Sequence, residues 1–118
     1  MPPVDITERS FKFAVRVVKL CKFLEEEGNV SRQLANQLLR SATSIGANIE
    51  EAQAAISKAD FTNKMYIACK EARETKYWLC LLKATEIVTE SRISSLLEES
   101  KEMVAILTTI TKNSRVNK

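Results

Sequence analysis

One segment of the chain combines small, hydroxylated and glycine residues in the manner of a phosphate-binding loop. It reads RSATSIGANIEEA and covers residues 40–52. A phosphate loop of the Walker type needs two spaced glycines, then Lys and Ser or Thr, after a buried strand. This segment has one glycine, Gly46, with no lysine after it and no strand-like sequence before it. We therefore expect a helix here rather than a phosphate loop.

Other residue types that support catalysis or metal binding are sparse. Glu71 and Glu74 lie on adjacent turns of an expected helix, but the chain has no histidine to complete a di-metal bundle site. Three widely spaced cysteines, Cys21, Cys69 and Cys80, form no CxxC pair, which is typical of reduced, buried thiols rather than a zinc site. We expect no catalytic residue, no metal ligand and no cofactor, and hence no enzyme.

The composition indicates long helices with few connections. The chain has 118 residues, of which 45% are hydrophobic and 28% charged, and its formal net charge is +3. Only two glycines and two prolines occur, whereas a β protein of this size needs many turn residues. The sequence predicts a single all-α domain over residues 1–118, an antiparallel up-down-up-down four-helix bundle. Its helices are expected at about residues 6–27, 31–56, 59–88 and 92–111.

Capping signals and apolar spacing support these helices. Asp5, Ser31 and Ser57 are suitable N-caps, and the polar tail from Lys112 is expected to fray. Apolar or small residues recur in alternating steps of three and four, which favours near-parallel helix packing. The rows are Leu38, Ala42, Ile45, Ile49, Ala52 and Ile56; then Phe61, Met65, Ala68, Ala72, Thr75, Leu79 and Leu82; then Ile93, Leu96, Ser100, Met103, Leu107 and Ile110.

The first helix carries more apolar surface than packing within one bundle requires. The excess predicts a partner, and self-association is the simplest one; a deeply embedded helix is the alternative. One row consists of Ile6, Phe13, Val17, Leu20 and Leu24, and a second of Phe11, Ala14, Val15, Val18 and Cys21.

A basic arc runs along the same helix. Several cations on one arc can bind the phosphates of RNA or DNA, and symmetric copies of the chain would multiply them. The alternative is a solvated face, or salt bridges to Glu8, Glu26 or the acidic fourth helix of a neighbour. The arc consists of Arg9, Lys12, Arg16 and Lys19.

Small residues in the second helix indicate a close helix-helix contact. Gly46 inside a helix costs about 1 kcal/mol relative to alanine, and Ala42, Gly46 and Ala47 allow another backbone to approach. Arg40 and Asn48 would then lie near that contact, where they can bond helix carbonyls or an acidic partner.

Two features of the third helix concern packing. Lys70 and Glu74 have the spacing of a stabilising i, i+4 ion pair. Tyr77 and Trp78 are adjacent and so point in different directions. We expect one to enter the core and the other to meet an interface or a groove.

Two longer motifs carry a resemblance to a known family. RSATSIGANIEEAQAAISKADF (residues 40–61) and IACKEARETKYWLCLL (residues 67–82) resemble the bacterial four-helix bundle family, also called the ribosomal RNA intervening-sequence protein family. Members are encoded in inserts within large-subunit rRNA genes or as free-standing genes, and a related branch is the accessory variability protein of diversity-generating retroelements. The motif residues are Arg40, Ser41, Gly46, Asn48, Glu71, Glu74, Tyr77 and Trp78.

The resemblance implies a four-helix bundle that assembles as a homopentamer and has no known enzymatic activity. In the retroelement branch the assembly binds its reverse transcriptase and nucleic acid. We therefore expect a non-enzymatic, oligomeric scaffold whose partners are itself, RNA or DNA, or a nucleic-acid-handling protein. A structural protein-interaction module without a nucleic-acid role is the alternative. No signal peptide and no apolar run of about 18 residues is present, so we expect a cytoplasmic protein without membrane contact.

Overall fold

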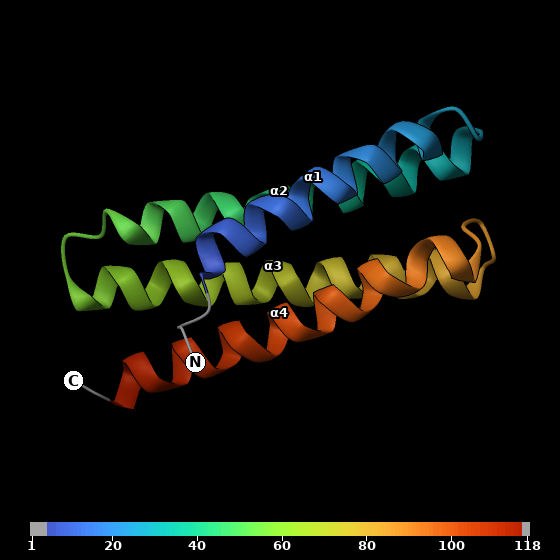
Figure 1. Ribbon diagram of the computed structural model, residues 1–118. Coiled ribbons are helices and arrows are strands. Elements are labelled where there is room, and N and C mark those ends of the chain that lie inside the picture. The colour runs from blue at the N-terminus through green and yellow to red at the C-terminus, as the bar shows by residue number, and fades with distance from the viewer. Residues whose placement is uncertain (1–4, 117–118) are drawn as a thin grey trace.

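Four antiparallel helices make up the computed structural model, which describes residues 5–116 (Figure 1). Short connections make each helix run opposite to the one before it, so the topology is up-down-up-down and the predicted fold class is confirmed. The described residues contain no strand. The helices are α1 (Ile6–Glu25), α2 (Asn29–Gln53), α3 (Lys58–Ala84) and α4 (Glu90–Val116).

Two of the three predicted N-caps are present. The Asp5 carboxylate accepts the Glu8 amide at 3.1 Å, and the Ser57 hydroxyl accepts the Asp60 amide at 3.0 Å. Ser31, in contrast, does not cap α2 but is buried within its first turn. The N-cap of α2 is Gly28, whose φ of +126° only glycine adopts readily. The N-cap of α2 therefore lies three residues earlier than the capping pattern predicts, at Gly28 instead of Ser31.

The other helix ends also differ from the expected bounds. α2 ends at Gln53, so Ile56 lies in the connection and is 95% exposed rather than in the core row. α3 ends at Ala84, followed by Glu86 in the left-handed conformation (φ +58°). α4 continues to Val116, so the predicted fraying from Lys112 is wrong for residues 112–116. Contacts between α3 and α4 extend to this end of the bundle, which explains the added turn.

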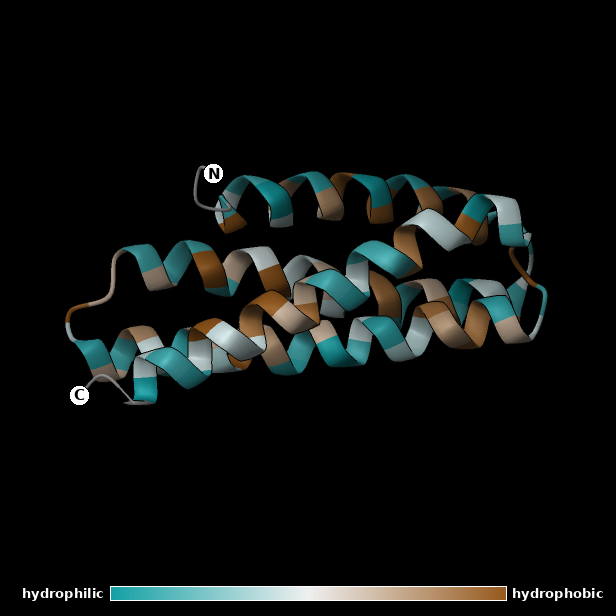
Figure 2. Ribbon diagram, turned by 60° about the horizontal axis from the view of Figure 1, so that its bottom comes forward, coloured by the Kyte–Doolittle hydropathy of each residue, from teal (hydrophilic) through white to brown (hydrophobic). Residues whose placement is uncertain are grey.

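The apolar rows form one core along the bundle. Apart from Ile56, every residue of the three predicted rows is buried or packs against the core from a partly buried position. The first row of α1 is fully buried as well. Figure 2 shows hydrophobic segments recurring along all four helices, as amphipathic packing requires. The largest wholly buried side chains include Phe13, Leu38, Ile45, Met65, Leu79, Ile93 and Leu107.

The four helix-helix interfaces of the bundle are unequally packed. α1 packs closely on α2, α2 on α3 and α3 on α4, whereas α1 and α4 touch at few points. The molecule is elongated, measuring 48 × 27 × 20 Å along its principal axes. Because α1 and α4 pack loosely, polar side chains of these two helices can meet along the α1–α4 edge.

Candidate nucleic-acid interface

The basic arc of α1 begins with a cation that is already paired inside the molecule. Arg9 reaches α4, where its Nε lies 2.6 Å from Glu99 Oε2 and its Nη2 lies 2.8 Å from Glu99 Oε1. Nη2 also lies 3.3 Å from Glu102 Oε2. This guanidinium, hydrogen-bonded to Glu99, holds the pKa of that carboxyl below its ordinary value. Arg9 therefore links α1 to α4 within one chain. Because Glu99 and Glu102 already pair with its guanidinium, Arg9 is poorly placed to bind a phosphate.

Lys12 is paired as well, but locally. Its Nζ lies 2.8 Å from Glu8 Oε1, one turn earlier on α1, and both side chains are exposed. This contact with Glu8 is one of the alternatives that the sequence left open for the arc. An exposed pair of this kind is weak and can exchange for another anion.

The rest of the arc joins a cation from another helix. Arg16 and Lys19 line a hollow of about 140 Å³ together with Arg92 of α4, above the apolar side chains of Leu20 and Leu96. We call the three cations Arg16, Lys19 and Arg92 the basic hollow. None of them forms an ion pair with a residue in the described range 5–116.

Neutral contacts orient two of the three cations. Arg16 Nη2 donates to Ser95 Oγ at 2.9 Å, and the Arg92 guanidinium stacks 3.9 Å from the centroid of the Phe23 ring. Arg16 also lies close enough to Glu99 to lower the pKa of that carboxyl, although the Arg9 contact has the larger effect. The site is therefore a cationic hollow on the α1–α4 edge, bordered on one side by the Arg9–Glu99 pair.

Sequence reasoning missed Arg92. The fourth helix is mostly acidic near its start, so its single early arginine did not stand out. The predicted antiparallel bundle would have indicated that Arg92 lies near Arg16 and Lys19. If α1 and α4 are neighbours, the end of α1 lies beside the start of α4.

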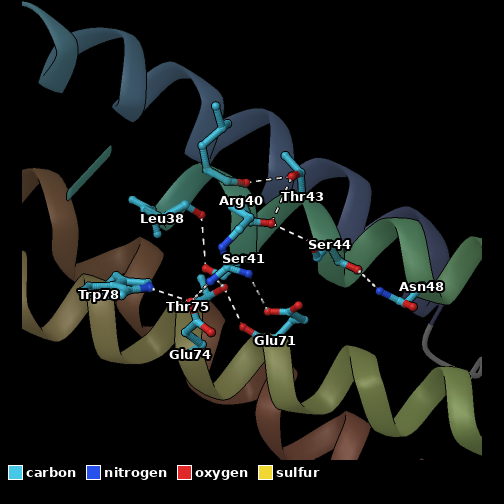
Figure 3. A network of polar contacts seen from close by, with 11 residues as sticks. Leu38, Arg40, Ser41, Thr43, Ser44, Asn48, Glu71, Glu74, Thr75 and Trp78 are labelled. Atoms are coloured by element: carbon cyan, nitrogen blue, oxygen red, sulfur yellow. Dashed lines mark hydrogen bonds and ion pairs between the residues drawn. The ribbon is translucent and has the colours of Figure 1, made fainter. Parts of the chain in front are cut away.

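The family-motif residues form a different structure, a polar network between α2 and α3 (Figure 3). The Arg40 guanidinium contacts Glu71, at 3.5 Å, and Glu74, which also accepts the Trp78 indole N–H at 3.0 Å. Both carboxylates are thus engaged within the chain. The predicted Lys70–Glu74 pair is wrong, because Glu74 turns to Arg40 instead.

Beneath this surface network lies a buried pair of hydroxyls. Thr75 Oγ1 donates to Ser41 Oγ at 2.9 Å, and Ser41 donates to the Leu38 carbonyl at 3.3 Å. Asn48 bonds only along its own helix in the contacts seen among the described residues, from Nδ2 to the Ser44 carbonyl at 2.8 Å. Most of the motif therefore holds α3 against α2, as Figure 3 shows, and the carboxylates of Glu71 and Glu74 are part of that contact.

Gly46 marks a close contact between α2 and α1. A Cβ built on Gly46 would lie 3.5 Å from Ser10 Oγ, an ordinary van der Waals distance. Ala42, one turn earlier on α2, is fully buried in the core. Ala47 is exposed instead and lines a shallow hollow of about 240 Å³ with Phe11 and other residues of both helices. The predicted close approach holds for Gly46 and Ala42 but not for Ala47.

The second apolar row of α1 is largely uncovered. Phe11 is 68% exposed, and Val15 and Val18 are each 38% exposed, whereas Cys21 is buried. These three exposed residues are referred to below as the apolar face of α1. On α3, Trp78 packs against the core, which confirms the core contact predicted for one ring of the pair. Tyr77 is 58% exposed, and its contact with an interface or a groove stays a prediction.

The cysteines divide by burial. Cys21 and Cys69 are buried, but Cys80 is exposed, which corrects the expectation of three buried thiols. Burial raises the pKa of Cys21 to about 11, so this thiol stays protonated at neutral pH. Residues 5–116 bring together no group of three or more potential metal-ligating side chains. No helix in the same range has both the length and the apolar character to cross a bilayer.

Comparison with known proteins shows which family the chain is similar to. A family model described as 23S rRNA-intervening sequence protein matches residues 3–109. A crystal structure of a protein with unknown function from the S23 ribosomal protein family of Bacteroides thetaiotaomicron VPI-5482 superposes with a TM-score of 0.83. It is 48% identical in sequence, and the match covers 91% of this chain and 98% of that one. No curated protein matches the chain.

Proposed function

Because this chain belongs to the 23S rRNA-intervening sequence protein family, we propose that it is a non-enzymatic, oligomeric binding protein whose ligand is nucleic acid. The ligand would dock on the α1–α4 edge, at the basic hollow. Arg9 and Lys12, which the sequence places in the same arc, are assigned a structural and a peripheral role instead.

The observation that carries this proposal is the convergence of Arg16, Lys19 and Arg92 without an ion-pair partner among the described residues. Three cations around one hollow repel one another and gain most from a ligand with several negative charges. A nucleic-acid backbone presents its phosphates at regular, close spacing. Leu20 and Leu96 form the floor of the hollow, which lowers the local dielectric and strengthens each contact with a phosphate.

Self-association is the second part of the proposal. The apolar face of α1 exposes a phenylalanine and two valines on one helix, and a second copy of the chain would bury them. The family resemblance implies a homopentamer. In such a ring the basic hollow is repeated in every subunit, so a long polyanion meets several equivalent sites at once.

A structural protein-interaction module is the competing function. The same apolar face supports it, since a different protein with an apolar surface could cover Phe11. A nucleic-acid-handling protein encoded nearby would be one such partner. The two functions differ in their response to salt, because apolar contacts are much less sensitive to ionic strength than phosphate contacts.

The deciding experiment is binding of the purified chain to duplex DNA, structured RNA and single strands over a range of salt concentrations, with oligomer mass measured on the same sample. We expect the logarithm of the affinity to fall linearly with the logarithm of salt concentration. Neutralising one contacting cation, as in Arg16→Gln, Lys19→Gln or Arg92→Gln, should reduce the slope by about 0.9.

Arg73→Gln is the matched control, since Arg73 is an exposed arginine on α3 away from the hollow. Its slope should equal that of the unmodified chain. Unchanged slopes in all three hollow variants would refute the assigned site. A well-formed oligomer that binds none of the three nucleic acids would favour the protein-interaction module.

A further inference from the structure

A second hollow, larger than the basic hollow, lies between other parts of the helices. It has a volume of about 570 Å³ and opens between the first turns of α3 and the last turns of α4. This is the end of the bundle where the α2–α3 connection lies (Figure 1). We call it the α3–α4 groove. The residues that line it include Lys58, Asn63 and Tyr66 on α3, and Thr111 and Arg115 on α4.

One end of the groove favours a negative charge. Lys58 and Arg115 both line it, and neither forms an ion pair with a described residue. Lys58 and Ala59 belong to the first turn of α3, whose amides have no acceptor within the helix and carry the positive end of its dipole. The nearby Asp60 carboxylate is directed at the preceding turn, where it accepts the Ile56 amide at 3.3 Å.

An aromatic ring lies further along the same wall. Tyr66 lines the groove and is 47% exposed, and the Lys70 Nζ lies 5.7 Å from the centroid of its ring. Asn63, also exposed, lies on the wall between the charged end and the ring. An exposed ring beside cations can stack a planar base, and an amide side chain can both donate to and accept from its edge.

A buried hydroxyl in the groove lacks a partner. Thr111 is 4% exposed, and its Oγ1 forms no hydrogen bond with any described residue. The adjacent hydroxyls of Thr62 and Ser114 pair with each other across the two helices. A buried polar group without a partner is costly and uncommon in folded proteins. Thr111 lines the groove, but its Oγ1 has almost no accessible surface, so a polar atom of a ligand can contact it only when the side chains that cover it shift.

We propose that the α3–α4 groove binds a nucleotide unit, with its phosphate near Lys58 and Arg115 and its base on Tyr66. Lys58 and Tyr66 are eight residues apart, about 12 Å along the helix axis. The ligand must therefore be elongated, with its anionic group at one end and its ring at the other. A polar atom between the two ends meets Thr111. This site shares no residue with the basic hollow and is independent of the function proposed above.

The test is calorimetric titration of the full chain with adenosine monophosphate, adenosine and inorganic phosphate. Adenosine monophosphate should saturate the protein and bind at least about tenfold more tightly than either fragment, since both ends contribute. Tyr66→Leu keeps an apolar side chain but removes the ring, and should weaken binding about five- to hundredfold.

Thr111→Val is the sharper variant, because it removes the hydroxyl and keeps the shape. It should weaken nucleotide binding and leave the thermal midpoint of the unliganded protein unchanged or higher, since an unpaired buried hydroxyl is lost. Lys58→Gln with Arg115→Gln should remove most of the salt dependence of nucleotide binding. Arg73→Gln is the control, since Arg73 is exposed on α3 and lines neither hollow, and this variant should bind adenosine monophosphate like the unmodified chain.

Two sources of the nucleotide unit can be distinguished. A single-stranded oligoadenylate that displaces adenosine monophosphate and binds more tightly would identify a strand as the ligand. An oligoadenylate that does not displace it would identify the free nucleotide. The proposal is overturned by an absence of saturable binding, by phosphate or adenosine binding as tightly as the complete nucleotide, or by Tyr66→Leu and Thr111→Val both binding normally. None of these outcomes depends on Arg16 or on the salt-dependent binding described above.

Discussion

At the scale of single residues, small hydroxyl side chains allow the helices to approach closely without leaving polar atoms unpaired. Ser10 donates to the Thr7 carbonyl at 3.1 Å, and Ser100 donates to the Leu97 carbonyl at 2.7 Å. Ser41 does the same at the α2–α3 interface, where it donates to the Leu38 carbonyl. Each hydroxyl bonds within its own helix, so it occupies a core position at little cost. Thr111 departs from this pattern, because its Oγ1 has no hydrogen-bond partner among the described residues.

Gly46 is the residue at which packing and helix propensity can be separated. A methyl group at this position would meet Ser10 Oγ at 3.5 Å, so alanine fits without a shift. We expect Gly46→Ala to raise the free energy of unfolding by up to about 1 kcal/mol, the propensity difference between the two residues. Gly46→Leu should lower it, because the longer side chain has to displace α1. Urea denaturation of both variants measures the two effects, and equal stability of the leucine variant and the natural chain would disprove the close contact.

At the scale of elements, the α1–α4 edge depends on polar contacts more than the other three sides do. α1 and α4 make few contacts, and Arg9 with Glu99 is the most direct of them. Both side chains are partly buried, at 27% and 18% exposure, so the pair is better protected from solvent than a fully exposed ion pair. We infer that this pair sets how firmly α1 lies against α4.

The contact gives a prediction for acid stability. Arg9 lowers the pKa of Glu99 in the folded chain, so its stabilisation is complete above the unfolded pKa of about 4.3 and is lost as pH falls through the lower, folded pKa. Glu99→Gln should cost about 1 kcal/mol at pH 7. That cost should shrink toward zero as pH is lowered below about 4. Unfolding free energies of the two proteins across this range provide the measurement. A constant difference at all pH values would show that the charge of Glu99 does not matter.

Helix interiors could be predicted from this sequence, and helix ends only where a side-chain cap marks them, as at Asp5 and Ser57. The three-four rhythm correctly identified buried positions such as Ile45, Met65 and Leu107, because burial repeats with the helix period. Ile56 has the same spacing but follows a helix that has already ended, so it is exposed. Ends depend on single backbone conformations, such as the positive φ of Gly28 and Glu86, which periodicity does not encode.

The candidate site was predictable only in part. Arg16 and Lys19 were identified from their spacing on one helix, but the partner of Arg9 lies 90 residues away on α4. Sequence spacing within a helix cannot show which cations are neutralised by another helix. Arg92 and the α3–α4 groove could not be predicted for the same reason, because each depends on two helices that the fold brings together.

At the scale of the whole molecule, the small net charge of +3 conceals an uneven surface. Acidic residues of α4 are used by Arg9, and those of α3 by Arg40. Cations without such partners remain at the basic hollow and in the α3–α4 groove. The apolar face of α1 is a third, uncharged surface. Oligomerisation through that third surface would leave both cationic places available in each subunit.

The assembly can be tested by placing charge on the apolar face of α1. We expect Phe11→Glu combined with Val18→Glu to reduce the oligomer mass to that of one chain, about 13.3 kDa. Burying two carboxylates in an apolar interface without partners costs far more than exposing them to water. Helical content should stay unchanged, because Phe11 and Val18 are exposed within the single bundle. Ile56→Glu is the matched control, since Ile56 is equally apolar and 95% exposed but lies in the α2–α3 connection. Light scattering at several protein concentrations gives the masses. If the double variant keeps the mass of the natural chain, or if the control dissociates in the same way, the apolar face of α1 is not where the subunits meet.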